Sequence, residues 1–245
     1  MKQVRLFSTD LDGTVVGNRD ATARFRDFWQ SLPADTRPLL VFNSGRLLDD
    51  QFELMADVPL PDPDYVIGGV GTMLSCRDQP SLRQAYTTSL GKAFDTEKII
   101  ALVSDVSGAS IQPERYQHGL KSSWYLHDAS EADLLAIENR LADHDIDARI
   151  VYSSNRDLDI LPRAADKGAA ITWLCDHLEI GLDEVVVAGD TGNDRAMFEL
   201  PGVRGIVVSN ALPELKALAK DRDSIFSALE SEADGVISGL KHWLS

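Results

Sequence analysis

The sequence is poor in cysteine and in long apolar runs, and each scarcity excludes a class of protein. Its 245 residues include only two cysteines, Cys76 and Cys175, far apart and in no zinc-like spacing, so we expect reduced thiols and neither a disulfide framework nor a zinc site. No apolar stretch reaches the roughly 20 residues that a membrane-spanning helix needs. Residues 1–5 show no signal-peptide pattern. We therefore expect a cytoplasmic protein with no membrane partner.

Positive charge is also scarce. Lysine and arginine number 24 against 39 aspartate and glutamate residues, which gives a formal net charge of −15. Nucleic acid is excluded as an expected partner, because its phosphates would be repelled. A small anion is not excluded, since surface carboxylates are screened within about 8 Å at physiological salt and a few local cations decide its binding. The length allows one large domain, or a core with a smaller second domain.

The most informative stretch is residues 6–16, LFSTDLDGTVV, where an apolar run of β character ends in two carboxylates, a glycine and a threonine. Asp10 and Asp12 would share one face of a strand, an arrangement that a divalent cation makes tolerable. Asp10 can attack phosphorus, and Asp12 can act as acid and base. Gly13 permits a tight turn, and Thr14 offers a hydroxyl to a phosphate. A simple turn after a strand would account for Asp12 and Gly13 alone.

A second strand end carries a hydroxyl. Residues 39–42 form a short apolar run, and a helical pattern covers residues 47–56, which together with the first strand predicts a βαβ unit. Ser44 and Gly45 stand at the carboxyl end of this second strand, where a hydroxyl and exposed backbone N–H groups suit a phosphoryl oxygen. Arg46 follows, and the sequence leaves open whether it reaches the site or only solvent.

Two further motifs lie in the last third of the chain. A helix opens at residue 166, and Lys167 occupies its first turn, where the helix dipole disfavours a cation unless an anion is near. An apolar strand over residues 185–188 then ends in the sequence GDTGND, which contains Asp190, Asn193 and Asp194. A capped helix start would explain one of these two acids but not both. Asp190 and Asp194 are therefore candidate metal ligands, and Asn193 is a candidate to hydrogen-bond beside them.

Residues 82–161 differ in character from the rest. Helical patterns over residues 96–106 and 131–143 alternate with strand patterns over 111–112, 120–126, 148–152 and 157–161. This predicts an α+β domain inserted into a parallel-sheet α/β core formed by residues 1–81 and 162–245. Polar side chains on these strands are candidates to face a sugar, but the same alternation is typical of a solvent-exposed face. The candidates are Gln117, His118, Lys121, Ser123, His127, Asp157 and Asp159.

The four motifs, in this order and each at a strand end or helix start, resemble those of the haloacid dehalogenase-like (HAD) phosphatases. The insert lies where that family carries its C2B-type cap, and segments 8–17, 116–124 and 151–154 resemble the sucrose-phosphatase-like branch. The resemblance implies a Rossmannoid core with catalytic roles for Asp10, Asp12, Ser44 and Lys167. It implies Mg²⁺ held by Asp10, Asp12, Asp190 and Asp194. It also implies a phosphate site formed by Gly13, Thr14, Ser44, Gly45, Lys167 and Asn193.

The same resemblance implies a Mg²⁺-dependent phosphatase acting on a disaccharide phosphate, sucrose-6-phosphate or mannosylfructose-6-phosphate, through an aspartyl-phosphate. Two alternatives stay open. A phosphomannomutase-like sugar phosphomutase would use the same Asp10 and Asp12 but return the phosphate to a sugar. A non-catalytic sugar-phosphate sensor would have no need of Asp12. A small sugar phosphate is the expected partner in all three cases, and the sequence does not fix the oligomeric state.

Overall fold

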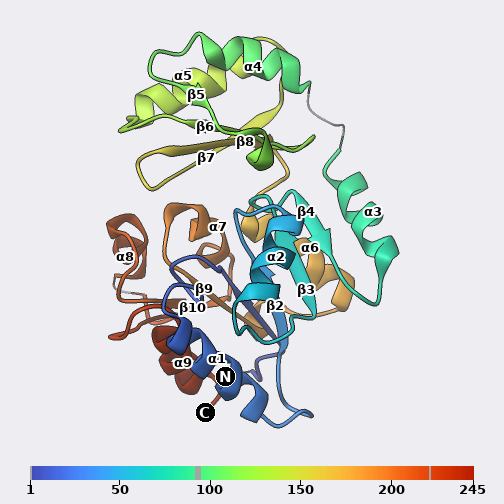
Figure 1. Ribbon diagram of the computed structural model, residues 1–245, viewed down its shortest axis with the longest axis vertical. Coiled ribbons are helices and arrows are strands. Elements are labelled where there is room, and N and C mark those ends of the chain that lie inside the picture. Colours follow the sequence, from blue (N-terminus) through green and yellow to red (C-terminus); the bar gives the residue numbers. More distant parts are fainter. Residues whose placement is uncertain (1, 92–94, 221) are drawn as a thin grey trace.

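Two β-sheets of different kinds lie one above the other (Figure 1). The structure, a computed structural model, describes residues 2–91, 95–220 and 222–245. The larger sheet has the strand order β11-β10-β9-β1-β2-β3-β4 and is parallel except for the edge strand β4. The smaller sheet has the order β5-β6-β8-β7 and is antiparallel. The expected α/β core with a separate α+β insert is confirmed.

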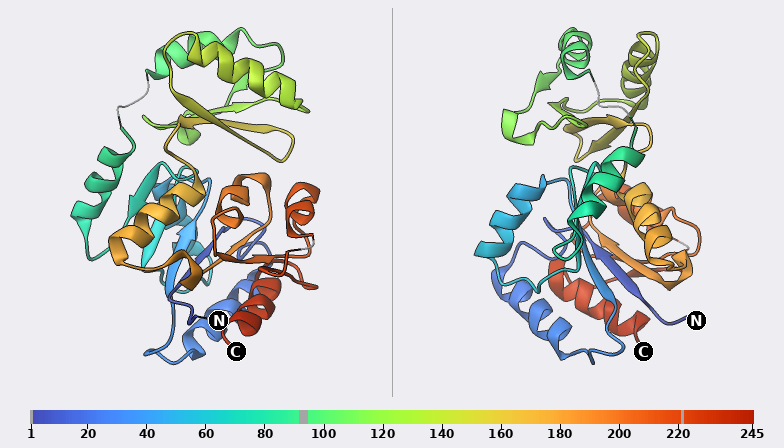
Figure 2. Two further views of the ribbon diagram at one scale, coloured as in Figure 1. Left: turned by 180° about the vertical axis from the view of Figure 1, so that it is seen from behind. Right: turned by 90° about the vertical axis from the view of Figure 1, so that its right-hand side faces the viewer.

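The core sheet is covered by helices on both faces, with α1 and α9 packed side by side on one face and α6 on the other (Figure 2). Its strands are β1 (Leu6–Thr9), β2 (Leu39–Asn43), β3 (Tyr65–Gly68), β4 (Met73–Ser75), β9 (Val185–Gly189), β10 (Arg204–Val207) and β11 (Ile225–Ser227). Its helices and 3₁₀ turns are α1 (Arg19–Ser31), α2 (Leu48–Asp57), α3 (Pro80–Ser89), α6 (Lys167–Leu178), η2 (Leu182–Glu184), η3 (Gly192–Asp194), α7 (Arg195–Phe198), α8 (Pro213–Ala219) and α9 (Glu232–Trp243).

Strand register explains why remote residues meet. Strand β1 lies between β2 and β9, and all three run in the same direction, with Thr9 opposite Phe42 on one side and Ala188 on the other. The strands are almost wholly buried and apolar, as expected for a parallel sheet covered on both faces. The residues that follow these strands therefore emerge together at one edge of the sheet, where open α/β sheets bind their ligands.

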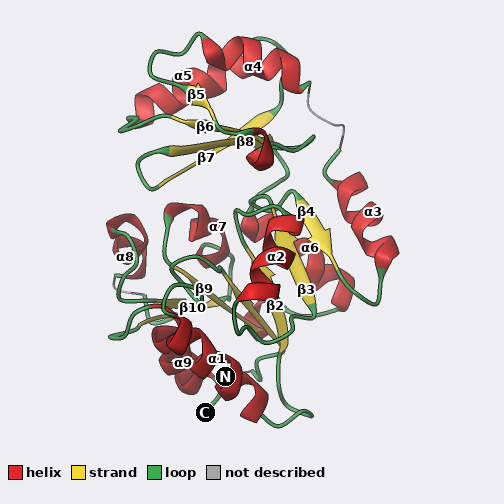
Figure 3. Ribbon diagram, in the orientation of Figure 1, coloured by secondary structure: helices red, strands yellow, loops and turns green. Residues whose placement is uncertain are grey.

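The insert, which we call the cap, has its own hydrophobic core around Trp124, Ile137 and Leu158. Its helices lie on the face of the small sheet that points away from the core sheet (Figure 3), so the opposite face is turned towards the carboxyl ends of β1, β2 and β9. The cap consists of α4 (Thr96–Ser104), β5 (Ser110–Ile111), η1 (Glu114–Tyr116), β6 (Ser122–Tyr125), α5 (Glu131–Ala142), β7 (Ala148–Ser153) and β8 (Asp157–Pro162).

The packing of helix α3 indicates where the cap begins. The sequence placed the start of the insert at residue 82, within this helix. Leu82 and Tyr86 pack into the core cluster, α3 contacts β4, and the Tyr86 hydroxyl donates to the carbonyl of Gly71 (2.5 Å). We therefore propose that the cap begins after α3. Among the described helices, none has the length and apolarity that crossing a bilayer requires.

Candidate active site

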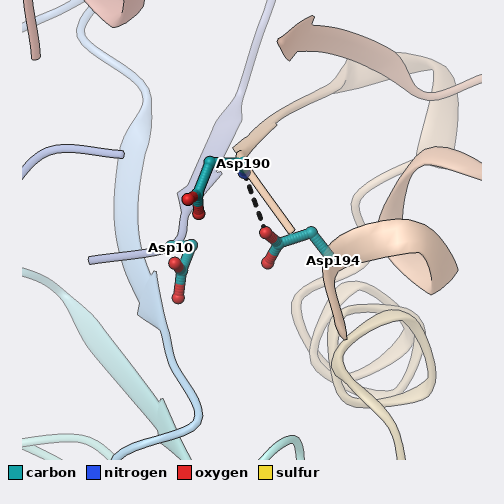
Figure 4. A group of neighbouring side chains, drawn as sticks. All are labelled: Asp10, Asp190 and Asp194. Atoms are coloured by element: carbon teal, nitrogen blue, oxygen red, sulfur yellow. Dashed lines mark hydrogen bonds between the residues drawn. The ribbon is translucent and has the colours of Figure 1, made fainter. Parts of the chain in front are cut away.

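Three buried carboxylates converge at the edge of the core sheet. Asp10 follows β1, Asp190 follows β9, and Asp194 ends η3; each can place a carboxylate oxygen within 4.8 Å of the other two (Figure 4). The Nζ of Lys167, the first residue of α6, lies 2.8 Å from Asp10 Oδ1 and 2.6 Å from Asp194 Oδ1. The fully buried lysine thus joins the first motif to the last.

The charges of this cluster do not balance. Burial, aided by the charge of Asp194, raises the pKa of Asp10 to about 7 although Lys167 opposes the shift. Burial and the charges of Asp194 and Asp10 raise the pKa of Asp190 to about 8. Burial alone would lower the pKa of Lys167, but the two carboxylates beside it outweigh burial and raise it. Three acids and one base in a buried site leave an excess of negative charge, which suits a bound metal ion.

Asp194 differs from the other two acids because both of its oxygens already have partners. Oδ1 accepts from Lys167, and Oδ2 accepts from the backbone N–H groups of Asp190 (2.9 Å) and Thr191 (3.0 Å). Its side chain also packs so closely on Gly189 that a Cβ there would collide with it. Asp194 therefore holds Lys167 and the loop after β9, while Asp10 and Asp190 keep more oxygen lone pairs free for a cation.

The turn after β1 is fitted around Asp190. Gly13 has φ +77°, and a Cβ at this position would collide with the Asp190 carboxylate, so only glycine suits both the backbone and the space. Thr14 is buried, and its hydroxyl donates to Asp190 Oδ1 (3.2 Å). From the sequence, a phosphate was the expected partner of this hydroxyl; in the structure the hydroxyl donates to a carboxylate of the cluster.

Residues from the end of the chain hold the same turn from outside. Asn210 Nδ2 donates to the carbonyl of Gly13 (2.7 Å), and its Oδ1 accepts from the backbone N–H of Glu232 (2.8 Å). The Glu232 carboxylate accepts from the backbone N–H of Asn18 (2.6 Å), the N-cap of α1. Glu232 adopts φ +51°, an uncommon value for a residue other than glycine. Both ends of the turn between β1 and α1 are therefore attached to the start of α9.

Asp12 lies apart from the three buried acids. Its side chain is half exposed (51%), and Arg46 donates to both of its oxygens, from Nε (2.6 Å) and from Nη2 (2.8 Å). Arg46 also pairs with Asp50 through Nη1 (2.9 Å). The sequence left the place of Arg46 open, and the structure puts it in the site. The Asp12 carboxylate is paired with this arginine and is not part of the cluster formed by Asp10, Asp190 and Asp194.

Three of the four motifs, those of Asp10, Ser44 and Asn193, contribute to the floor of a cavity of about 490 Å³ between core and cap. Asp10, Asp12, Ser44, Gly45 and Asn193 line it from the core side. Ser44 is buried, and its hydroxyl oxygen accepts from the backbone N–H of Arg46 (3.2 Å). The cavity thus places a carboxylate, a hydroxyl and exposed backbone beside one another, as phosphoryl chemistry requires.

Three of the seven cap candidates line the roof of this cavity, namely Lys121, Asp157 and Asp159. Lys121 and Asp159 are almost fully buried and paired at 2.9 Å, and Ser123 lies beneath them, with its hydroxyl donating to Asp159 (2.7 Å). A buried ion pair facing a polar cavity offers both a donor and an acceptor to a sugar hydroxyl.

The other cap candidates serve the cap itself or face away. The Gln117 amide bonds to the backbone of Gln112 and Ser123. The Nδ1 of His118 accepts from the backbone N–H of Leu120, and burial lowers the pKa of this histidine. His127 is exposed. None of these three side chains is among the described residues that line the cavity.

Several residues that line the cavity were not among the site residues expected from the sequence. Two are arginines that lie over tyrosine rings, Arg115 over Tyr116 (4.7 Å) and Arg156 over Tyr125 (5.5 Å). Arg156 sits in the turn between β7 and β8. Tyr125 is the last residue of β6. The remaining additions are Asp50, Gln112, Ser153, Ser154 and Thr191.

Comparisons with known proteins agree with this geometry. The family model described as sucrose-6F-phosphate phosphohydrolase matches residues 3–244. The chain is 65% identical to mannosylfructose-phosphate phosphatase of Agrobacterium fabrum (strain C58 / ATCC 33970), over 99% of this chain and 98% of that protein. It is 31% identical to sucrose-phosphatase 2 of Nicotiana tabacum, over 96% of this chain but only 58% of the tobacco protein.

Among solved structures, the sucrose-phosphatase of Synechocystis sp. PCC6803, in complex with sucrose and phosphate, superimposes with a TM-score of 0.88 and 26% identity, covering 99% of this chain and 98% of that one. The HAD-like fold expected from the motifs is confirmed. With motifs, cavity and family match in agreement, the chain belongs to the sucrose-6F-phosphate phosphohydrolase family of HAD sugar-phosphate phosphatases.

Proposed function

We propose that the chain is a Mg²⁺-dependent phosphatase whose substrate is mannosylfructose-phosphate. One observation supports the activity above the others: Asp10, bound by Lys167, lies on the floor of a polar cavity that the cap roofs with the Lys121–Asp159 pair. The 65% identity to a mannosylfructose-phosphate phosphatase favours that disaccharide over sucrose. Its two free thiols, of Cys76 and Cys175, accord with the reducing cytoplasm that we propose as its compartment.

In the first half-reaction, an oxygen of Asp10 bonds to phosphorus while the bond from phosphorus to the sugar oxygen breaks. Lys167 and Ser44 stabilise the charge that develops on the phosphoryl oxygens. Asp12 enters this step protonated, accepting from Arg46 through one oxygen only, and gives its proton to the departing sugar oxygen. In the second half-reaction, Asp12 takes a proton from water as the water oxygen bonds to phosphorus and the aspartyl-phosphate bond breaks. Asp10 is then regenerated and inorganic phosphate is released.

The residues present suit Mg²⁺. Asp10 and Asp190 offer hard, buried oxygen ligands with lone pairs to spare, and Asp194 stands beside them. We assign Asp12 to this site through its backbone carbonyl alone, because Arg46 occupies its carboxylate. When bound, the cation would neutralise the excess negative charge and polarise a phosphoryl oxygen.

The test is phosphate release from a panel of esters with Mg²⁺, measured first without and then with a bisphosphate primer. Mannosylfructose-6-phosphate, sucrose-6-phosphate and p-nitrophenyl phosphate are compared by kcat/KM. We expect the highest kcat/KM for mannosylfructose-6-phosphate. A preference for sucrose-6-phosphate would change the substrate and keep the reaction. Turnover only with a bisphosphate primer would identify a phosphomutase, and binding of sugar phosphate without turnover would identify a sensor.

A further inference from the structure

An ion pair joins the cap to the catalytic part of the core, away from the substrate cavity. Arg149, on the cap strand β7, pairs with Asp166, the residue immediately before Lys167. The Asp166 side chain is 8% exposed, and burial together with the charge of Arg163 lowers the pKa of Arg149. The pair borders a separate cleft of about 410 Å³ between cap and core. The Arg149 side chain is 37% exposed, so the pair is buried at its carboxylate and open to solvent at its arginine.

Asp166 controls how α6 begins. Its Oδ1 accepts from the backbone N–H of Ala169 (2.6 Å) and so caps the helix, while its Oδ2 faces Arg149. Its carbonyl accepts from the backbone N–H of Ala170 (3.0 Å) and lies directly against Gly71, which has φ +86° and leaves no room for a Cβ. The first turn of α6 is thus held by the core on one side and by the cap on the other.

The cap strand also touches the second catalytic element. A Cβ at Gly192, in η3, would lie 3.2 Å from the carbonyl oxygen of Tyr152 on β7, so the two backbones are close. Strand β7 therefore contacts both the helix that begins with Lys167 and the turn that ends with Asp194. Lys167 Nζ and Asp194 Oδ1 are themselves paired at 2.6 Å. The cap is docked against the two elements that hold this pair.

We propose that Arg149 is a positioning residue: through Asp166 it fixes the first turn of α6, and thereby Lys167 Nζ, when the cap is docked. The inference rests on the proposed function, which gives Lys167 its role. The lysine is fully buried and cannot compensate by rotating if its backbone moves. A displacement of about 1 Å at a reacting group can cost up to about a hundredfold in rate. Docking of the cap and alignment of the lysine are therefore coupled.

The effect should fall on kcat rather than on KM. Neither Arg149 nor Asp166 is among the described residues that line the substrate cavity. In Arg149→Met the stem remains and the charge is lost; in Asp166→Asn the charge is lost while an oxygen that can cap α6 remains. We expect kcat to fall roughly tenfold in either variant with little change in KM, because the substrate contacts stay in place. Arg149→Lys should restore part of kcat.

A double-mutant cycle separates this role from a general loss of stability. Arg149→Met combined with Asp166→Asn should be no worse than either single variant, because both remove one interaction. Arg140→Met is the matched control: this cap arginine on α5 pairs with Asp105 (2.9 Å) inside the cap, so its loss should leave kcat unchanged. Effects that multiply in the double variant, an unchanged kcat in Arg149→Met, or an equal fall in Arg140→Met would each overturn the proposal.

A second readout does not depend on activity. The backbone N–H groups of Ala169 and Ala170 are protected by Asp166, so hydrogen exchange at these two amides reports on the first turn of α6. Arg149→Met should speed exchange there and leave the last turn of the helix unchanged, and Arg140→Met should change neither. If Arg149→Met speeds exchange but the wild-type chain releases no phosphate, the proposed function is wrong and the coupling still stands. Unchanged exchange in Arg149→Met would mean that the coupling fails.

Discussion

Arg46 donates to both oxygens of the Asp12 carboxylate, from Nε to Oδ2 and from Nη2 to Oδ1. This fork fixes where the carboxylate lies, and we expect its loss to disturb the transfer of a proton to the sugar oxygen. Arg46→Met should lower kcat for a disaccharide phosphate by roughly a hundredfold, the scale of general acid–base catalysis. p-Nitrophenyl phosphate, whose leaving group needs no proton, should be affected far less.

Arg24→Met is the control for that substitution. Arg24 makes an equally close fork to Asp234, but this pair lies on the surface of α1 and α9, away from the cavity. Both activities should stay near the wild-type value in this variant. Equal losses on the two substrates in Arg46→Met would show that Arg46 does not act through Asp12.

Asp10→Asn tests the nucleophile. The substitution keeps the size of the side chain and one oxygen, but an amide cannot displace the sugar oxygen from phosphorus. Phosphate release should fall by at least about a thousandfold, as removal of a nucleophile usually does. Circular dichroism and thermal unfolding should still show a folded protein. Turnover close to that of the wild type would rule out Asp10 as the nucleophile.

Substitutions of Lys121 and of His127 should have different effects on KM, although the sequence made both residues candidates to face a sugar. Lys121 lines the cavity and His127 does not. Lys121→Met should raise KM for the disaccharide phosphate by roughly tenfold, the worth of one charged hydrogen bond, and should leave KM for p-nitrophenyl phosphate nearly unchanged. It should also lower the melting temperature, because Asp159 is left buried without its partner.

His127→Ala is the matched control in the same strand region and should change neither KM nor stability. A rise in KM for both substrates in Lys121→Met would mean that this residue affects the phosphate site and not the sugar. A rise in His127→Ala would show that the cap meets the substrate in another orientation.

The acid cluster makes stability depend on pH. Because the folded-state pKa values of Asp10 and Asp190 are about 7 and about 8, against an ordinary aspartate value of 3.8, the folded protein binds more protons than the unfolded chain between these limits. The free energy of unfolding in metal-free solution should therefore fall as the pH rises from about 4 to about 8. Asp190→Asn should weaken this dependence.

Mg²⁺ should act in the opposite sense, since a metal ion competes with protons for the same carboxylates. The increase in melting temperature on adding Mg²⁺ should be larger at about pH 8 than at about pH 5. Scanning calorimetry with and without the ion measures both effects. An increase that is the same at both pH values would show that the ion does not bind to these acids.

The sequence predicts a site residue most directly where a polar residue follows an apolar strand of the parallel sheet. Asp10, Ser44 and Asp190 each follow an apolar strand, and parallel pairing alone brings such residues together. Lys167 was found because a cation in the first turn of a helix needs an anion near it. Each of these residues is unusual in its local sequence, either as a polar residue after an apolar strand or as a cation at a helix start. Each lies near another such residue that is remote in the sequence.

Other placements depend on contacts that no local sequence rule contains. Leu82 and Tyr86 have helical spacing whichever domain they pack against, so the sequence could not say that α3 lies on β4. Arg149 and Arg156 look like ordinary surface residues until the cap is docked. Thr14 offers a hydroxyl in either role, and only the position of Asp190 decides which one it takes.

The attachment of Glu232 to Asn18, and of Asn210 to Gly13, has a consequence for how the enzyme matures on the ribosome. The turn that carries Asp12 is made early, but the residues that fasten it emerge about 200 positions later. A nascent chain that already contains β1, β2 and α1 would still have this turn loose. We therefore expect phosphate release to begin only after α9 has left the exit tunnel.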